Sequence, residues 1–337
     1  MTARFASNTD SNFLARRIPR VLHSTRMTLL LTGSDVAALL TLDDCINAVE
    51  EAFRAHGEGR LHAPGILSAH EERGAFHIKT ASVNGRFGAK ANANFPGQTP
   101  SIQGVMLLFD ANDGRVLAIM DSIELTVLRT GAATAVAAKY LARKESRSAM
   151  IYGVGRQGRV QLEAITRVLP IERAYVHDID EASAKQYASE MSAKLNIEVS
   201  RAPAPAACDV IITCTPSKTA FLRDGASFIA AVGADNPSKS EIDPSLMRAS
   251  RVVADIVDQC AEIGDLRAAI AAGAMTRDDV HAELGAIVAG RKSGRTRDDE
   301  QFIFDSTGCG FQDTAAASIA YDRAIQQKRG TEVNLAR

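Results

Sequence analysis

The sequence predicts an α/β protein built from two domains, and three observations carry this prediction. The 337 residues suit about two domains, each long enough to bury a core of its own. After residue 148, short apolar runs alternate with helical segments, which is typical of a parallel sheet with helices on both faces. Before residue 121, several apolar runs follow closely on one another, and Asp113-Gly114 between two of them is a strong hairpin signal. We therefore expect a mixed or antiparallel sheet first and a doubly wound parallel sheet after it.

A glycine-rich turn opens the parallel part. The apolar run 149–152 leads into Gly153-Val-Gly-Arg-Gln-Gly158, and residues 159–168 then follow a helical pattern. In such a strand–loop–helix, Gly153 permits the tight turn, Gly155 lets a pyrophosphate approach the backbone, and Gly158 lets helix and strand pack closely. The free N–H groups at the helix start stabilise the phosphates. An ordinary glycine turn is the alternative, but the whole context favours a Rossmann-type dinucleotide-binding domain.

Asp178 supports this interpretation and bears on the choice of cofactor. The next apolar run, 173–177, ends in Asp178, which lies ~20 residues after the last glycine, where a carboxylate accepts hydrogen bonds from the ribose hydroxyls. A carboxylate there repels a 2′-phosphate, and neither Ile179 nor Asp180 is basic. The sequence therefore predicts NAD(H) rather than NADP(H).

Composition excludes several other classes of protein. The net charge of −1 gives no field that favours nucleic acid or an anionic membrane, and no apolar run approaches the ~20 residues that span a bilayer. The five cysteines are scattered without a CxxC pair, which argues against a zinc site or a disulfide framework and indicates reduced thiols. We expect a cytoplasmic protein with no metal site.

Residues 1–26 differ from the rest of the chain, because five arginines face a single acid, Asp10. A basic leader of this kind is compatible with a transit peptide. It is equally compatible with a start codon placed too early, since Met27-Thr-Leu-Leu-Leu31 reads like a natural beginning. We interpret residues 1–26 as a disordered extension.

From Met27 onward the pattern predicts individual elements. Residues 27–31 form a strand, Ser34 and Thr41 are plausible N-caps, and a helix over 42–53 ends at Gly57 and Gly59. A long helix over about 122–141 joins the two domains. Further strands are expected at 75–83, 87–93, 104–109 and 116–120 in the first domain, and near 149–152, 173–178, 197–200, 209–213, 228–232 and 251–254 in the second.

Four charged residues outside the glycine loop are candidates for chemistry. Arg129 lies on an Ala- and Leu-rich helix, where it would bind either a substrate carboxylate in bidentate fashion or an acid of the other domain. Lys79 and Lys90 lie in predicted strands, so each side chain points into a cleft or into solvent. Asp235 follows a strand that ends in glycine, at the edge where ligands bind. It would handle protons there, or form a turn before Pro237.

Several separated motifs together resemble the ornithine cyclodeaminase/mu-crystallin family over about residues 30–321. They are Leu125-Thr-Val-Leu-Arg-Thr-Gly131, Gly153–Gly158, Val232-Gly-Ala-Asp235, His281-Ala-Glu-Leu-Gly285, and Phe304-Asp-Ser-Thr-Gly308 followed by Gln312-Asp313. The resemblance implies a dimer. It also implies a substrate-binding and dimerisation domain of residues 27–125 with 306–337, to which a helix at about 313–328 returns, and an NAD-binding domain of residues 126–305.

The resemblance also implies roles for individual residues. Arg129 and Lys90 match the residues that hold the substrate α-carboxylate in this family, and Asp235 matches the aspartate that handles protons beside the α-nitrogen. Mu-crystallin itself lacks that aspartate, so its presence favours catalysis. The predicted cofactor-binding residues are Thr130, Gly153, Gly155, Arg156, Gln157, Gly158, Asp178, Thr215, Val232 and Gly233.

The sequence departs from the family pattern at two places. Relatives commonly carry a carboxylate-binding arginine two residues after a proline, but Pro64-Gly-Ile66 has none, and we expect Lys79 to supply the missing charge. Ornithine-using relatives place an acid near the strand that contains residues 75–78 to hold the distal ammonium. That run has no acid here, although Glu71 or Glu72 is a conceivable substitute.

These features predict an NAD(H)-dependent oxidoreductase that acts on the Cα–N bond of a small α-amino or α-imino acid. Examples are a reductase of cyclic imino acids of the pyrroline-2-carboxylate or ketimine type, or an amino-acid dehydrogenase. One alternative is an ornithine or lysine cyclodeaminase, a lyase that uses NAD catalytically and releases ammonia. The other is a non-catalytic small-molecule binder similar to mu-crystallin.

Overall fold

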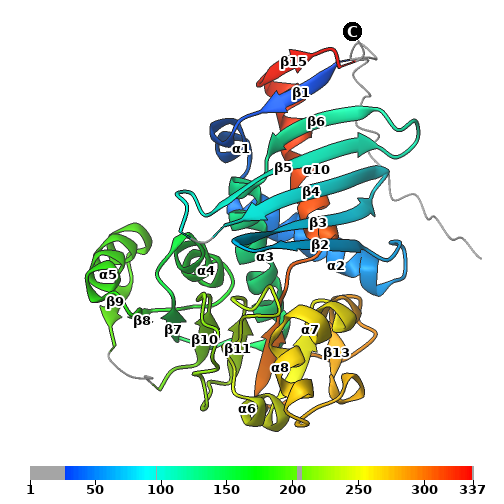
Figure 1. Cartoon of the computed structure of the whole chain (residues 1–337). Coiled ribbons are helices and arrows are strands. Elements are labelled where there is room, and N and C mark those ends of the chain that lie inside the picture. The colour runs from blue at the N-terminus through cyan, green and yellow to red at the C-terminus, as the bar shows by residue number, and fades with distance from the viewer. Residues whose placement is uncertain (1–26, 96, 203–206, 336–337) are drawn as a thin grey trace, which may run out of the picture.

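The computed structural model describes residues 27–95, 97–202 and 207–335, and it has two sheets (Figure 1). The expectation of a disordered extension at 1–26 falls outside these residues. The first sheet is mixed, as predicted, because β1 and β6 are parallel and the other pairs are antiparallel. Its order is β15 (Thr331–Val333), β1 (Thr28–Leu31), β6 (Val116–Asp121), β5 (Ile102–Asp110), β4 (Arg86–Asn94), β3 (Gly74–Val83) and β2 (Gly65–Glu71).

Helices cover one face of this sheet, which is its inner face. They are α1 (Gly33–Leu39), α2 (Leu42–Gly57) and α10 (Gly310–Gln327). In Figure 1, α10 passes behind the strands, and it packs against β3, β4 and α2. Thr41 caps α2, as predicted, with Asp44 completing a capping box. The prediction for Ser34 was wrong: the cap of α1 is Thr32, because the helix starts two residues earlier and takes Ser34 into its first turn.

The second sheet is parallel throughout and has helices on both faces, which confirms the doubly wound fold. Its order is β13 (Ala282–Glu283), β12 (Arg251–Ala254), β14 (Phe302–Asp305), β11 (Phe228–Ala231), β10 (Val210–Thr213), β7 (Ser148–Tyr152), β8 (Arg173–His177) and β9 (Glu198–Arg201). Its helices are α4 (Arg156–Thr166), α5 (Glu181–Leu195), α6 (Pro244–Ala249), α7 (Val257–Ile263), α8 (Asp265–Ala271) and α9 (Leu284–Val288). The strand order reverses between β7 and β10, and the crevice above such a reversal is where ligands bind.

Helix α3 (Ile123–Leu141) connects the sheets and packs against both α2 and α4. Its alanines are buried on all sides, and a Cβ on Gly131 would lie 2.9 Å from the Val160 side chain of α4. The small side chains therefore allow close contact between the halves. At the start of α3, Asp121 Oδ1 accepts hydrogen bonds from the backbone N–H groups of Ile123 and Glu124.

Four strands were not predicted. β13 and β15 are too short for a periodic pattern, and β2 mixes polar and apolar residues. β14 has only four residues, Phe302–Asp305, yet it lies between β11 and β12 in the centre of the sheet. Burial on both faces gives such a strand no alternation to detect. Among the described residues, no helix is long and apolar enough to cross a membrane, and the five cysteines are unpaired.

Candidate active site

The three loop glycines have the geometry that a dinucleotide requires. Gly153 has a φ of +96°, which suits glycine in a tight turn. A Cβ on Gly158 would lie 2.1 Å from the Gly153 carbonyl oxygen, so a glycine is needed for the helix to pack on the loop. A Cβ on Gly155 would meet nothing within 4 Å, so this side of the backbone is open. Binding of a pyrophosphate here stays a prediction that this geometry fits.

Asp178 lies beside the same loop, because its Oδ2 accepts a hydrogen bond from the Val154 N–H at 3.0 Å. The other predicted cofactor-binding residues make different contacts. Arg156 begins α4 and donates from Nη2 to Glu124 Oε1 at 2.5 Å, whereas Gln157 is half-buried on the same turn. The Thr130 hydroxyl donates to the Thr126 carbonyl at 2.7 Å within α3. Arg156 therefore ties the loop to the connecting helix.

Thr215, Val232 and Gly233 follow the adjacent strands β10 and β11, so all three lie at the carboxyl edge of the sheet. The Cβ position of Gly153 lies 2.8 Å from the Cys214 carbonyl and 3.3 Å from the Thr215 side chain. Gly153, Thr215 and the segment 232–233 therefore lie along the same edge of the sheet. Behind this edge lies a buried acid that sequence reasoning missed, Glu241.

Two predicted substrate residues meet at a third residue, Asp313. Arg129 Nε donates to Asp313 Oδ1 at 2.8 Å, and Lys90 Nζ donates to the same oxygen at 2.9 Å. Arg129 Nη1 also donates to Gln312 Oε1 at 2.9 Å. All three charged side chains are buried. Asp313 lies in the first turn of α10 and belongs to a motif quoted above, but only the tertiary structure shows its contacts.

Lys79 joins this cluster from β3. It is the direct cross-strand partner of Lys90 in β4, so both side chains lie on the inner face of the sheet. Its Nζ donates to the carbonyl oxygens of Thr307 at 2.7 Å and Gly308 at 2.9 Å. The Gly308 backbone has a φ of +79°, and a Cβ there would lie 2.5 Å from Arg129 Nη1. The loop 306–308 is therefore shaped around both cations.

The electrostatics of the cluster favour an anionic ligand. Burial and the neighbouring Arg129 lower the pKa of Lys79, and the same two causes lower the pKa of Lys90 to about 7. Burial alone would raise the pKa of Asp313, but Arg129, Lys90 and Lys79 outweigh it and lower that pKa. Asp313 is thus ionised, and the repulsion from Arg129 helps to lower the pKa values of the two lysines. Another carboxylate would relieve the repulsion among them.

Asp235 lies in the turn after β11 and is partly exposed. Its Oδ1 accepts a hydrogen bond from Lys239 Nζ at 2.7 Å. Burial opposes ionisation, but Lys239, Lys79 and His77 together lower the pKa of Asp235. The carboxylate is therefore ionised and lies within the electrostatic range of the cationic cluster. His77 shares the inner face of β3 with Lys79, and its Nδ1 lies 2.9 Å from Ser68 Oγ.

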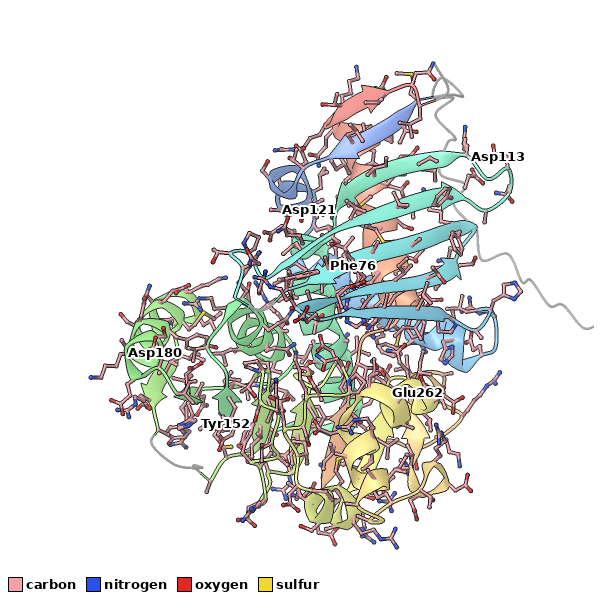
Figure 2. The ribbon with its side chains drawn as sticks, in the orientation of Figure 1. Phe76, Asp113, Asp121, Tyr152, Asp180 and Glu262 are labelled. Atoms are coloured by element: carbon pink, nitrogen blue, oxygen red, sulfur yellow. The ribbon has the colours of Figure 1, made fainter. Side chains whose placement is uncertain are left out.

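A cavity of about 250 Å³ lies between the two domains beside these residues. Ile66 and Ser68 of β2 line one side, and Pro237, Glu262 and Ile263 line the other. Ile66 is the direct cross-strand partner of Lys79, so the cavity adjoins the cationic cluster. Figure 2 places Glu262 on the side of the second domain that faces the first sheet. An acid from the second domain therefore lines the cavity beside the first sheet.

A larger cavity of about 420 Å³ lies elsewhere, between the end of α3 and residues 294–298. Two of its cations already have partners: Arg143 donates to the Asp298 carbonyl, and Arg295 donates to the carbonyls of Leu141 and Ser227. Among the described residues, no group of three His, Cys, Asp or Glu side chains could hold a metal ion. The cleft between the sheets is thus the better candidate for an active site.

The fold and the site define a two-domain protein with a dinucleotide-type glycine loop and a buried cluster of cationic side chains. Comparison with known proteins gives the family. The sequence model of the ornithine cyclodeaminase/mu-crystallin family matches residues 26–328, and the chain belongs to this family.

Individual relatives match the chain over nearly its whole length. The alanine dehydrogenase of Archaeoglobus fulgidus is 36% identical over 320 residues, which is 92% of this chain and 99% of that protein. The iminosuccinate reductase of Paracoccus denitrificans is 33% identical over 91% of this chain and 100% of its own length.

Two solved structures have the same fold. An archaeal alanine dehydrogenase dimer with bound NAD has a TM-score of 0.88 at 36% identity and covers 92% of this chain and 99% of its own. The Δ1-pyrroline-2-carboxylate reductase of Thermococcus litoralis, in complex with NADH and L-proline, has a TM-score of 0.86 at 32% identity. That match covers 91% of this chain and 100% of the reductase.

Proposed function

We propose that this protein is an NAD(H)-dependent oxidoreductase that acts on the Cα–N bond of a small α-amino or α-imino acid. The observation that carries the proposal is the convergence of Lys79, Lys90 and Arg129 on the inner side of the interdomain cleft. This cluster suits the α-carboxylate that all such substrates share. The relatives named above are oxidoreductases of amino and imino acids and include NAD-bound and NADH-bound structures, which supports the cofactor and the reaction class.

The residues of the glycine loop fit NAD(H). Gly155 leaves its side of the backbone open, and the N–H groups at the start of α4 suit a pyrophosphate. Asp178 suits the ribose hydroxyls of NAD(H) and disfavours a 2′-phosphate. When bound, the nicotinamide supplies the hydride for reduction or accepts it for oxidation.

The protein's own residues would position the substrate and manage its charge. Lys79, Lys90 and Arg129 hold the carboxylate and thereby place the α-carbon and its nitrogen in the cleft. Reduction of an imine adds a hydride to the carbon and requires a proton on the nitrogen. Because Asp235 is ionised, it would stabilise the positive charge of an imine that is already protonated, and addition of the hydride to the carbon then gives the neutral amine. In the oxidative direction the carboxylate would accept the proton that an ammonium group must lose before the hydride leaves.

We also propose that the chain forms a homodimer through the outer face of the first sheet. Leu67, Phe76, Ile78, Phe87 and Val105 are all exposed, and the strand registers place them on that face. The face is turned to the viewer in Figure 2, where Phe76 is labelled. An apolar patch of this kind typically marks a protein interface. The alanine dehydrogenase relative is described as a dimer.

The two sheets support the proposed division of the chain into domains, and the cysteines support its proposed location. We assign residues 27–125 with 306–337 to the substrate-binding and dimerisation domain, and 126–305 to the NAD-binding domain. The five unpaired cysteines suit the reducing cytoplasm.

A second candidate function is that of a diamino-acid cyclodeaminase, and one observation favours it. Glu262 lines the cavity beside Lys79, where its carboxylate would bind a distal ammonium group. A substrate side chain with a terminal amine would extend from the cationic cluster toward this acid. The same site would then serve an oxidation at the α-carbon followed by loss of ammonia.

One experiment with the purified full-length protein separates these functions. NADH absorbance is followed with cyclic imino acids and with 2-oxo acids plus ammonia, while NAD with ornithine or lysine is assayed for released ammonia. We expect NADH consumption with an imino acid or with a 2-oxo acid plus ammonia. Ammonia release without net change in NADH would instead establish the cyclodeaminase. Tight NADH binding without either reaction would establish a binding protein.

The variant Asp235→Asn tests the catalytic assignment. We expect kcat to fall at least about a hundredfold while the affinity for NADH is unchanged, because the carboxylate acts on the nitrogen rather than on the cofactor. Asp224→Asn, at an exposed position, is the matched control. Full turnover in Asp235→Asn would contradict the assignment.

A further inference from the structure

The end of β10 and the end of β11 are joined by one buried carboxylate, that of Glu241. Its Oε1 accepts hydrogen bonds from the Thr215 N–H and the Thr215 hydroxyl, both at 2.7 Å. Its Oε2 accepts a hydrogen bond from the Gly233 N–H at 2.9 Å. The side chain is fully buried, and all three donors are neutral groups. Burying a carboxylate is costly, so its presence without a cation in direct contact calls for an explanation.

The contact between Glu241 and Gly233 leaves no space for a side chain at position 233. A Cβ on Gly233 would lie 2.3 Å from Glu241 Oε2. On the other side, Thr215 contacts the glycine loop, since its side chain lies 3.3 Å from the Cβ position of Gly153. Glu241 therefore fixes the two strand ends that face the strand reversal, and through Thr215 it supports the turn that begins the dinucleotide loop.

Glu241 is itself held in place by other segments of the second domain. Its backbone N–H donates to Asp265 Oδ1 at 2.8 Å, and the Ile242 N–H donates to the same oxygen at 3.1 Å. Asp265 starts α8, and Asp305 Oδ2 accepts a hydrogen bond from the Leu266 N–H at 2.8 Å. The support for Glu241 thus reaches the central strand β14, which leads into the loop that binds Lys79.

We infer that Glu241 is a positioning residue for NAD(H) and that it works in its ionised form. The inference rests on the proposed dinucleotide binding. An ionised carboxylate offers acceptors to all three donors. The O–H of a protonated carboxyl must point at an acceptor. The Thr215 hydroxyl can reverse and accept it, whereas the N–H groups of Thr215 and Gly233 cannot, so protonation replaces charge-assisted hydrogen bonds with weaker neutral ones. The two strand ends are then held less firmly at the edge proposed for the cofactor.

The groups around Glu241 place its protonation near neutral pH. Burial, together with the negative charge of Asp265, raises the pKa of Glu241 to about 7. The titratable groups facing Glu241 are Asp265 on α8 and the Cys214 thiol after β10, and burial raises the pKa of that thiol as well. Lys239, two residues before Glu241, is bound to Asp235. As the pH falls through about 7, Glu241 takes up a proton, so the affinity for NADH should fall.

The test is a fluorescence titration with NADH on the full-length protein between pH 5.5 and 8.5, without substrate. For the wild type we expect the Kd for NADH to rise at least about fivefold from pH 8 to pH 6. Glu241→Gln keeps the size of the side chain but turns an amide N–H toward one of the donors. Its Kd for NADH should be about tenfold higher than that of the wild type at pH 8 and independent of pH.

The matched control is Glu198→Gln, an exposed acid on β9, which should behave like the wild type. A purely structural role for Glu241 would lower the melting temperature of Glu241→Gln and leave the pH profile of its Kd unchanged, which would overturn the inference. If Glu241→Gln does not fold, a wild-type Kd that stays flat from pH 8 to pH 6 would overturn it equally. Absence of NADH binding by the wild type at every pH would contradict the proposed function as well.

Discussion

Ile66 and Lys79 are direct cross-strand partners in the β2–β3 ladder, and both side chains lie on the inner face of the sheet. The family resemblance implies a carboxylate-binding arginine two residues after Pro64, and this chain has Ile66 there. The positive charge is thus present on the neighbouring strand, directly opposite the position where it is missing. This register gives the hypothesis about Lys79 a geometric basis.

The first prediction concerns Lys79 as the substitute for an arginine at position 66. Lys79→Met should lower kcat/KM at least about tenfold, since loss of one charged hydrogen bond to a carboxylate costs about 1.5–3 kcal/mol. The double variant Ile66→Arg with Lys79→Met should recover a large part of the loss, because it returns the charge to the opposite strand. Steady-state kinetics with the best substrate from the panel measure both. Lys185→Met, at an exposed position on α5, is the control. Unchanged kinetics in Lys79→Met would refute the role of Lys79.

The second prediction is a pH dependence that arises at Lys90. Its pKa is lowered to about 7, so the side chain is cationic below that pH and becomes neutral as the pH rises. The affinity for a carboxylate should therefore be greatest below pH 7 and should fall above it. A 2-hydroxy acid is the suitable ligand, because it has no nitrogen that titrates in this range. Competitive inhibition measured from pH 6 to pH 9 gives its binding constant.

The variant Lys90→Arg separates Lys90 from the other groups that titrate. Arginine stays charged across the whole range, so the inhibition constant should no longer rise with pH. A rise of wild-type size in this variant would show that another group is responsible.

The third prediction contrasts two loop glycines. Gly155→Ala should change the free energy of unfolding by no more than about 1 kcal/mol, because the added methyl group meets nothing. It should nevertheless weaken NADH binding, since the methyl group occupies the side open to the pyrophosphate. Gly158→Ala should instead destabilise the fold by about 2 kcal/mol or more, because its methyl group would overlap the Gly153 carbonyl. Chemical denaturation and NADH titration of both variants test this contrast. Equal effects on stability would contradict it.

The fourth prediction concerns the proposed dimer. Ile78→Asp places a charge on the exposed apolar face of the first sheet and should shift the protein to monomers. Analytical ultracentrifugation over a range of concentrations measures the change. Ile179→Asp is the matched control, because Ile179 is 98% exposed and lies after β8, away from this face. A monomeric wild type, or a dimer that survives Ile78→Asp, would show that this face is not the interface.

The features that the sequence determined by itself are local in the chain. The glycine loop, its strand and helix, and the hairpin at Asp113-Gly114 follow from short-range rules, because turn residues and periodicity act within a few positions. The two-sheet α/β fold follows from the order of these patterns. Arg129, Lys90 and Asp235 were candidates because of their charge and predicted positions, and the resemblance to a known family supplied their expected roles.

The tertiary structure decided how distant residues meet. Strand register places Lys79 opposite Ile66, and the packing of α10 brings Asp313 between Arg129 and Lys90. Docking of α7 brings Glu262 to the cavity, and the turn after β11 places Glu241 beneath two strand ends. A single acidic residue produces no periodic pattern in the sequence. Its function depends on which groups surround it once the chain has folded. Sequence therefore predicted the glycine loop, whereas folding assembled the charged cluster.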